Sequence, residues 1–152
     1  MRIELENEQA TQALAGALSR VARAGDVIAL KGDLGTGKTV FARAFIRALC
    51  GADTEVPSPT FTLVQTYDLD DERTLHHFDL YRLKDPEEAL ELDIDDAFSD
   101  GISLIEWPER LGPYLPRQHL EVTLSYGGSE MQRSCVISAS DEWDQRLAEV
   151  SL

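Results

Sequence analysis

The segment Gly32–Thr39 constrains the fold of this chain more than any other feature. Its sequence, Gly-Asp-Leu-Gly-Thr-Gly-Lys-Thr, satisfies the pattern G-x-x-x-x-G-K-[ST] in full. The apolar run Val27–Leu30 precedes it, as expected for a strand buried on both faces. An amphipathic helix is predicted over Lys38–Leu49, and Gly51 ends it. A strand, a glycine-rich loop and a helix in this order predict a phosphate-binding loop in an α/β domain.

The residue types of this loop suit a nucleoside triphosphate with magnesium. Glycines allow the backbone to fold around phosphates and to present its N–H groups to them. The helix that begins at Lys38 adds the positive end of its dipole at the same place. Lys38 is expected to reach the β and γ phosphates, and the Thr39 hydroxyl to ligate magnesium. The expected nucleotide contacts are Gly35, Thr36, Gly37, Lys38, Thr39 and Val40.

Two acidic residues follow predicted strands and are candidates for the magnesium site. Glu106 comes directly after the apolar strand 102–105, which is the Walker B arrangement with a glutamate. A solvent-facing glutamate at a strand end is the alternative interpretation. Asp79 follows the predicted strand 74–78 and is a candidate to bind a magnesium-bound water or to orient the attacking water. Lys38, Asp79 and Glu106 are therefore the candidate catalytic residues, and Thr39 and Glu106 the candidate magnesium ligands.

The whole chain, residues 1–152, is predicted to form one α/β domain. The expected fold is a sheet of the phosphate-loop NTPase type, flanked by helices and carrying a C-terminal β-hairpin. The other predicted elements are a helix over 8–24, strands over 61–67 and 74–78, a helix from Asp85, the hairpin strands 120–126 and 131–139, and a helix from Asp141.

Composition excludes several classes of function. The 28 acidic and 14 basic residues give a net charge of −14, which argues against a stand-alone nucleic-acid binder and against docking on an anionic membrane. Six basic residues nevertheless lie within 20–47, so an anion can still be attracted to the loop. Cys50 and Cys135 lack disulfide or zinc spacing. With no apolar stretch of ~18 residues and no signal peptide, the expected location is the cytoplasm.

Other classes of phosphate-loop protein are disfavoured by the motifs that the chain lacks. There is no N-K-x-D motif to read a guanine base and no D-x-x-G after the loop, so a Ras-like GTPase is disfavoured. The segment Leu124–Ser129 differs from the signature of ABC transport ATPases by an inserted tyrosine and by its position after Glu106, and it is interpreted as a hairpin turn. His76, His77 and His119 lack metal-ligand spacing, which predicts turn or packing roles.

Four segments together carry a more specific signal: the loop 32–39, then 58–64, 77–83 and 105–110. In this order and spacing they resemble the TsaE family (formerly YjeE), bacterial ATPases of tRNA modification. The resemblance spans nearly the whole chain. It implies that ATP and Mg²⁺ bind, and that the protein docks on a TsaB–TsaD complex, which transfers a threonylcarbamoyl group to the adenosine beside the anticodon. Hydrolysis would permit repeated cycles, and tRNA would be met only indirectly.

The resemblance also implies roles for further residues. The segment 58–60 would form a switch-like loop that senses the γ-phosphate, with Thr60 as the contact. Trp107 would lie beside the nucleotide, with an ordinary core tryptophan as the alternative. Thr11 would position the adenine end. Arg82 would stabilise charge in cis or, alternatively, pair with the acidic segment that follows it.

Three functions remain open at this stage. The leading hypothesis is a magnesium-dependent ATPase whose turnover resets a partner enzyme, and it predicts slow hydrolysis by the isolated chain because no arginine finger is evident near the loop. The second is a nucleotide-gated binding module in which hydrolysis is incidental. The third is a small-molecule kinase, which is disfavoured because the chain lacks an arginine-rich lid.

Overall fold

The computed structural model describes residues 1–59, 62–69 and 73–150. Its strands are β1 (Arg2–Leu5), β2 (Val27–Lys31), β3 (Val64–Asp68), β4 (Thr74–Asp79), β5 (Ile102–Glu106), β6 (Leu120–Tyr126) and β7 (Arg133–Ser138). The α-helices are α1 (Glu8–Val21), α2 (Lys38–Cys50), α3 (Ile94–Asp100) and α4 (Asp141–Ala148), and the 3₁₀ helices are η1 (Pro86–Leu92) and η2 (Pro108–Tyr114). None of the described helices is long and apolar enough to cross a membrane.

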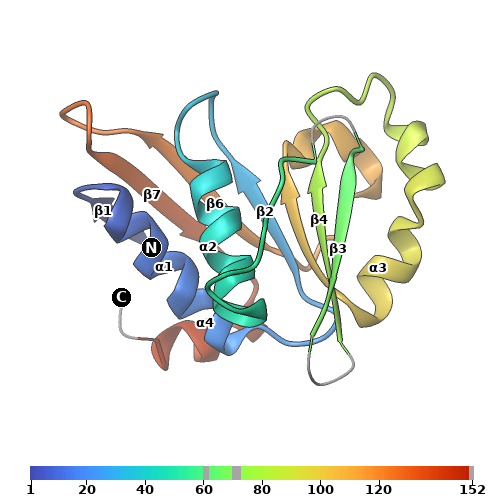
Figure 1. Cartoon of the computed structure of the whole chain (residues 1–152), viewed down its shortest axis with the longest axis horizontal. Coiled ribbons are helices and arrows are strands. Elements are labelled where there is room, and N and C mark those ends of the chain that lie inside the picture. Colours follow the sequence, from blue (N-terminus) through green and yellow to red (C-terminus); the bar gives the residue numbers. More distant parts are fainter. Residues whose placement is uncertain (60–61, 70–72, 151–152) are drawn as a thin grey trace.

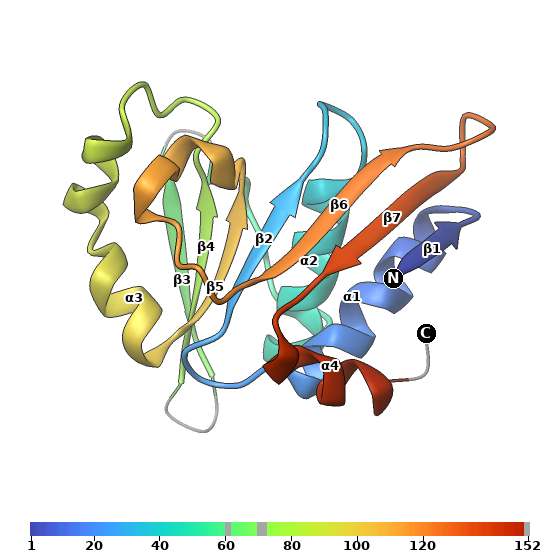
Figure 2. The ribbon, with the colours of Figure 1, turned by 180° about the vertical axis from the view of Figure 1, so that it is seen from behind.

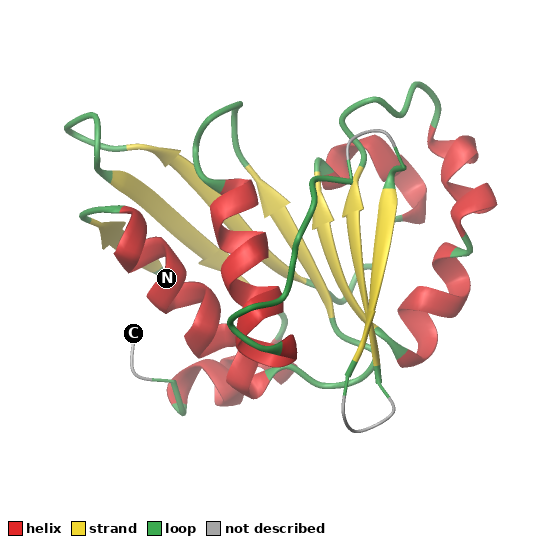
Figure 3. Cartoon of the chain, viewed as in Figure 1, coloured by secondary structure: helices red, strands yellow, loops and turns green. Residues whose placement is uncertain are grey.

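The strands form one twisted sheet in the order β1-β7-β6-β2-β5-β4-β3 (Figures 1 and 3). Strand β2 runs parallel to both of its neighbours, β5 and β6, and β4 runs parallel to β5. Strands β7, β1 and β3 are added antiparallel at the two sides. The carboxyl ends of β2, β5 and β4 therefore meet at one edge, where ligands of open α/β sheets bind. The α/β fold with a C-terminal hairpin is confirmed.

Alternate side chains of the central strands pack against two different sets of helices. Ile28 of β2 and Leu104 of β5 belong to the apolar cluster that also contains residues of α1 and α2. Val27 and Ile105, one position away on the same strands, belong to a second cluster with residues of α3, η1 and η2. Figure 2 shows this second side from behind. The sheet is thus covered on both faces, which explains why most residues of β2 and β5 are apolar.

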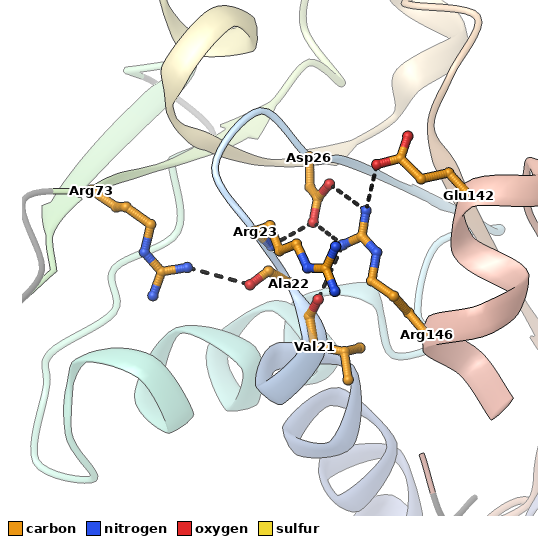
Figure 4. Close-up of polar contacts among 7 residues, drawn as sticks. All are labelled: Val21, Ala22, Arg23, Asp26, Arg73, Glu142 and Arg146. Carbon is orange, nitrogen blue, oxygen red and sulfur yellow. Dashed lines mark hydrogen bonds and ion pairs between the residues drawn. The ribbon is translucent and has the colours of Figure 1, made fainter. Parts of the chain in front are cut away.

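The C-terminal helix α4 is fixed at the amino end of β2 (Figure 4), which is the opposite end of that strand from the phosphate loop (Figure 1). The Arg146 guanidinium forms a bidentate pair with the Asp26 carboxylate, at 2.6 and 3.0 Å, and donates to the Val21 carbonyl at 3.0 Å. Asp26 also accepts from the Arg23 N–H at 2.5 Å. The Arg146 guanidinium lies 3.9 Å from the centre of the Trp143 ring. Helix α4 therefore closes the end of the sheet with one buried ion pair.

Two elements were not expected from the sequence. Strand β1 pairs antiparallel with β7, with Ile3 opposite Cys135. It was not predicted because it is only four residues long and contains two apolar residues, Ile3 and Leu5. The 3₁₀ helix η2 begins after Trp107 and turns back over β5, and Pro108 at its first position fits a helix start.

Some predicted boundaries were wrong. The first helix ends at Val21 instead of residue 24, because the chain turns there and Asp26 binds the backbone of this turn. The strand predicted over 61–67 begins at Val64, since Leu63 has a left-handed φ of 67° that interrupts extended backbone. Asp85 caps a helix as predicted, with a reciprocal capping box. That helix is 3₁₀ up to Leu92, and α3 follows it.

Candidate nucleotide site

The phosphate loop, residues 32–39, connects β2 to α2 at the carboxyl edge of the sheet. All three of its glycines have positive φ: 146° at Gly32, 82° at Gly35 and 108° at Gly37. At Gly32 a Cβ would lie 2.4 Å from the Leu124 carbonyl oxygen of β6, so only glycine fits against the neighbouring strand. No side chain caps α2 at Gly37, as suits a helix end that receives an anion.

Lys38 is buried beneath the loop, with 5% of its surface exposed. Its Nζ donates to the Gly32 carbonyl and, at 2.9 Å, to the Asp33 carbonyl. The ammonium also lies 4.2 Å from the centre of the Trp107 ring. Burial lowers the pKa of Lys38, and four carboxylates oppose this effect: Glu106, Glu109, Asp79 and Asp33. A bound polyphosphate would add negative charge and favour the ammonium form further.

The pairing of β4 with β5 places Asp79 directly opposite Glu106. Both side chains are buried, with 7% and 3% exposed. The Thr39 hydroxyl donates to Oε1 of Glu106 at 3.1 Å, and the Tyr81 N–H donates to Oδ1 of Asp79 at 3.1 Å. The solvent-facing alternative for Glu106 is therefore wrong. One hydroxyl and two carboxylates make an oxygen-only donor set, which suits a hard cation such as Mg²⁺.

His77 is the site residue that sequence reasoning missed. It was expected to have only a turn or packing role. Instead its Nε2 lies 2.7 Å from Oε2 of Glu106, and its ring is almost fully buried. The available signal was the spacing: His77 stands two residues before Asp79 on one strand, so both side chains point to the same face of the sheet.

Trp107 is half-buried: it lines the larger cavity and also packs against the second apolar cluster, so both its place beside the nucleotide and its packing role stay predictions. Its backbone has a left-handed φ of 60°, an arrangement that costs roughly 1–3 kcal/mol in a residue other than glycine. This turn directs the indole toward Lys38 and toward Tyr81, whose ring centre lies 5.0 Å away. Strain of this kind concentrates at functional sites, where surrounding contacts hold it.

A cavity of ≈ 410 Å³ joins most of the predicted residues. Those that line it are Gly35, Gly37, Lys38, Thr39, Val40, Asp79, Glu106 and Trp107. Thr11 and Thr36 instead line a smaller cavity of ≈ 190 Å³, which shares Gly35, Gly37 and Val40 with the first. The two cavities thus lie on either side of the phosphate loop.

Two residues named from the resemblance are not placed in these cavities. Thr60 lies outside the described residues, although its neighbour Ser58 lines the larger cavity. Arg82 is exposed and is not among the described residues that line either cavity. Over the part of the chain that is described, no group of three or more His, Cys, Asp or Glu side chains could hold a metal ion. Mg²⁺ commonly takes one or two carboxylates and completes its shell with phosphate oxygens and water.

The β6–β7 hairpin fastens the tip of the phosphate loop, a contact that the sequence did not indicate. The Tyr126 hydroxyl donates to the Leu34 carbonyl, and the Arg133 guanidinium donates to the Gly35 carbonyl at 3.3 Å. The guanidinium also lies 5.1 Å from the centre of the Tyr126 ring. Arg133 lines the smaller cavity together with Thr11. The hairpin therefore forms part of the site.

Comparisons with known proteins give a consistent result. The family model "Threonylcarbamoyl adenosine biosynthesis protein TsaE" matches residues 5–135. Proteins named tRNA threonylcarbamoyladenosine biosynthesis protein TsaE are similar to this chain. The one from Rickettsia felis is 41% identical, covering 91% of this chain and 80% of its own length. The one from Bacillus subtilis is 33% identical, covering 95% and 90%.

A solved structure has the same fold. The crystal structure of YdiB from Bacillus subtilis superposes with a TM-score of 0.80 at 28% sequence identity, and the match covers 98% of this chain and 92% of that one. The similarity therefore extends over the sheet, the helices and the phosphate loop alike. The family match and the relatives agree in turn with the four segments that first suggested the resemblance. The chain belongs to the TsaE family of threonylcarbamoyladenosine biosynthesis proteins.

Proposed function

We propose that this chain is a magnesium-dependent ATPase subunit for threonylcarbamoyl modification of tRNA, and that its hydrolysis allows a TsaB–TsaD complex to turn over repeatedly. One observation carries the proposal. Lys38, Thr39, Asp79 and Glu106, from three separate elements, converge on one cavity beside the phosphate loop. The relatives' printed names support the tRNA pathway.

The residues present fit Mg²⁺. The Thr39 hydroxyl and the Glu106 carboxylate already share a hydrogen bond, so their oxygens lie together at the edge of the cavity. These two residues would hold the ion, and Asp79 would bind one of its waters. When bound, Mg²⁺ neutralises negative charge on the phosphate oxygens during transfer of the γ-phosphoryl group.

The chain's own groups supply the rest of the chemistry. Lys38 and the backbone N–H groups of the loop would bind the β and γ phosphates and stabilise the charge that develops on the γ-phosphate oxygens. Both oxygens of Glu106 are engaged, one by Thr39 and one by His77. Because Glu106 is assigned to the metal, we assign orientation of the attacking water to Asp79. Trp107 and Tyr81 form a wall that limits the access of bulk water.

The surface around the site supports a protein partner. Leu34 at the loop tip is 62% exposed, and Tyr126, whose hydroxyl donates to the Leu34 carbonyl, is 57% exposed. These two large exposed side chains adjoin each other, and adjoining exposed apolar groups mark interaction surfaces where isolated ones do not. The net charge of −14 disfavours direct binding of the tRNA backbone. Both features are those of a subunit that docks through its nucleotide end on proteins and leaves the tRNA to them.

Phosphate release from Mg²⁺–ATP, measured with the chain alone and with a TsaB–TsaD pair, tests the proposal. We expect slow release alone, stimulation by the pair, and a loss of about 10²–10³-fold in Lys38→Ala, because a preorganised charge stabiliser is removed. Lys84→Ala is the matched control, since Lys84 is exposed and lies outside the cavity. Wild-type release by Lys38→Ala would overturn the assignment.

A second experiment distinguishes an ATPase whose hydrolysis is required from a module that needs only bound nucleotide. Glu106→Gln keeps the shape of the side chain but removes its charge, so we expect the variant to bind ATP and to hydrolyse it poorly. Under the proposal, this variant supports a single round of tRNA modification by the pair. Full multiple-turnover activity with Glu106→Gln would instead indicate a nucleotide-gated binding module.

A further inference from the structure

We propose that His77 is a positioning residue that fixes the Glu106 carboxylate for magnesium, an inference that rests on the proposed function. The two side chains come from neighbouring strands, β4 and β5, and their contact is 2.7 Å between Nε2 of His77 and Oε2 of Glu106. Only 1% of His77 and 3% of Glu106 is exposed, so water does not compete for this contact.

The strand register explains the contact. Asp79 lies opposite Glu106, and His77 lies opposite Leu104, so His77 is the diagonal neighbour of Glu106. Residues two apart on a strand share a face, and this face is the one that carries the phosphate loop and α2. A longer side chain than serine or threonine is needed to reach across the diagonal, and an imidazole spans that distance.

Two hydrogen bonds, one to each oxygen, fix the orientation of the Glu106 carboxylate. Oε2 receives the His77 N–H, while Oε1 receives the Thr39 hydroxyl at 3.1 Å. As a magnesium ligand Glu106 would act as a carboxylate, which only accepts hydrogen bonds, so Nε2 of His77 would be the donor in this contact. The other ring nitrogen, Nδ1, is buried and has no hydrogen-bond partner among the described residues. Among the described residues, the contact with Glu106 is therefore the one side-chain hydrogen bond of His77, and packing around the buried ring holds the imidazole in place for it.

A carboxylate held at Oε2 presents Oε1 to the cavity beside Thr39. Outer partners of this kind orient metal ligands, and their removal typically weakens metal affinity or activity by about 10–100-fold. The alternative is that His77 only stabilises a buried charge. Under that alternative its loss lowers the melting temperature but leaves metal affinity unchanged.

The test is binding of Mn²⁺, followed by electron paramagnetic resonance, to the whole chain with a non-hydrolysable ATP analogue. For His77→Leu we expect Mn²⁺ affinity to fall about 10–100-fold, with metal-free binding of the analogue within about threefold of wild type. His77→Gln, whose amide reaches the position of Nε2, is expected to stay within about threefold of wild type. His77→Asn is too short and is expected to behave like His77→Leu, which keeps the test valid if the leucine variant does not fold.

His76→Leu is the matched control, because His76 is half-buried, stacks on Phe78 at 6.2 Å between ring centres and does not line the cavity. Wild-type Mn²⁺ affinity in a folded His77→Leu or His77→Asn protein would overturn the inference, as would a His77→Gln protein as weak as His77→Asn. Failure of the wild-type chain itself to bind Mn²⁺ with the analogue would overturn the proposed function instead.

Discussion

Replacing Arg146 by methionine should destabilise the fold strongly while leaving the chemistry of the site intact. The substitution keeps an apolar stem of similar length against Trp143 but removes the guanidinium. Asp26 then loses both bonds of its bidentate pair, at 2.6 and 3.0 Å, and the Val21 carbonyl loses its donor. Among the residues that the structure describes, the Arg23 N–H alone still donates to the Asp26 carboxylate.

The size of the expected loss in unfolding free energy follows from the burial of Arg146 and Asp26. Arg146 is 3% exposed and the Asp26 side chain 9% exposed, so the remaining carboxylate is an uncompensated charge largely outside water. Removing one partner of such a pair costs about 3–5 kcal/mol. At about 2–4 °C per kcal/mol for a chain of this length, the melting temperature falls by roughly 6–20 °C. Urea unfolding followed by circular dichroism at neutral pH measures the free energy directly.

A second substitution separates charge from packing. In the double variant Asp26→Asn/Arg146→Met no charge remains, and asparagine still accepts from the Arg23 N–H. We expect this protein to recover at least half of the lost free energy, since apolar replacement of a buried pair is often close to neutral. A loss below about 1 kcal/mol in the single variant, or no recovery in the double variant, would refute the reasoning.

Three further predictions concern the site and the core. Gly32→Ala should abolish ATP binding and lower the melting temperature, because its Cβ would meet the Leu124 carbonyl at 2.4 Å; calorimetric titration and thermal unfolding measure both. Tyr126→Phe removes the bond to the phosphate-loop carbonyl and should cost about 1 kcal/mol of stability and weaken ATP binding a few-fold. Burial raises the pKa of the Cys135 thiol to about 11, so at pH 8 a thiol reagent should modify Cys50 first in the native protein and both cysteines in denaturant.

Each of these has a contrary outcome. A Gly32→Ala protein that binds ATP normally would mean that β6 can move away from the loop. If Tyr126→Phe bound ATP as tightly as wild type, the hairpin would contribute only packing contacts and not support nucleotide binding. Equal reaction of both thiols in the native state would show that the strand pair around Cys135 opens readily.

The sequence predicts those parts of this fold whose structure is determined by the residue pattern of one short segment. The loop 32–39 is such a part, because the left-handed backbone of the turn itself requires Gly35 and Gly37, and Lys38 directly follows it. Strand β1 is the opposite case. Its pairing partner is β7, which lies about 130 residues further along the chain, and its own signal is one polar–apolar alternation over four residues, the shortest run that indicates a strand.

The same distinction holds for the site. Glu106 is recognisable because an apolar run ends in an acid, and its burial then follows from the parallel sheet. The contact of His77 with Glu106 depends on the register between β4 and β5, which no local pattern encodes. Likewise, the grip of Tyr126 and Arg133 on the loop depends on where β6 lies beside β2. These contacts are set by tertiary structure alone.

The order of the strands in the sheet has a consequence for how the protein is made. Strand β2, which carries the phosphate loop, leaves the ribosome before either of its neighbours in the sheet, because β5 and β6 begin only at residues 102 and 120. Until those strands have been made, the loop has no sheet to hold it, and ordering it must wait for pairings distant in sequence, which form slowly. Nucleotide capture is thereby confined to chains that already contain β5 and β6, and a product that terminates before β5 exposes the apolar residues of β2 to aggregation or proteolysis.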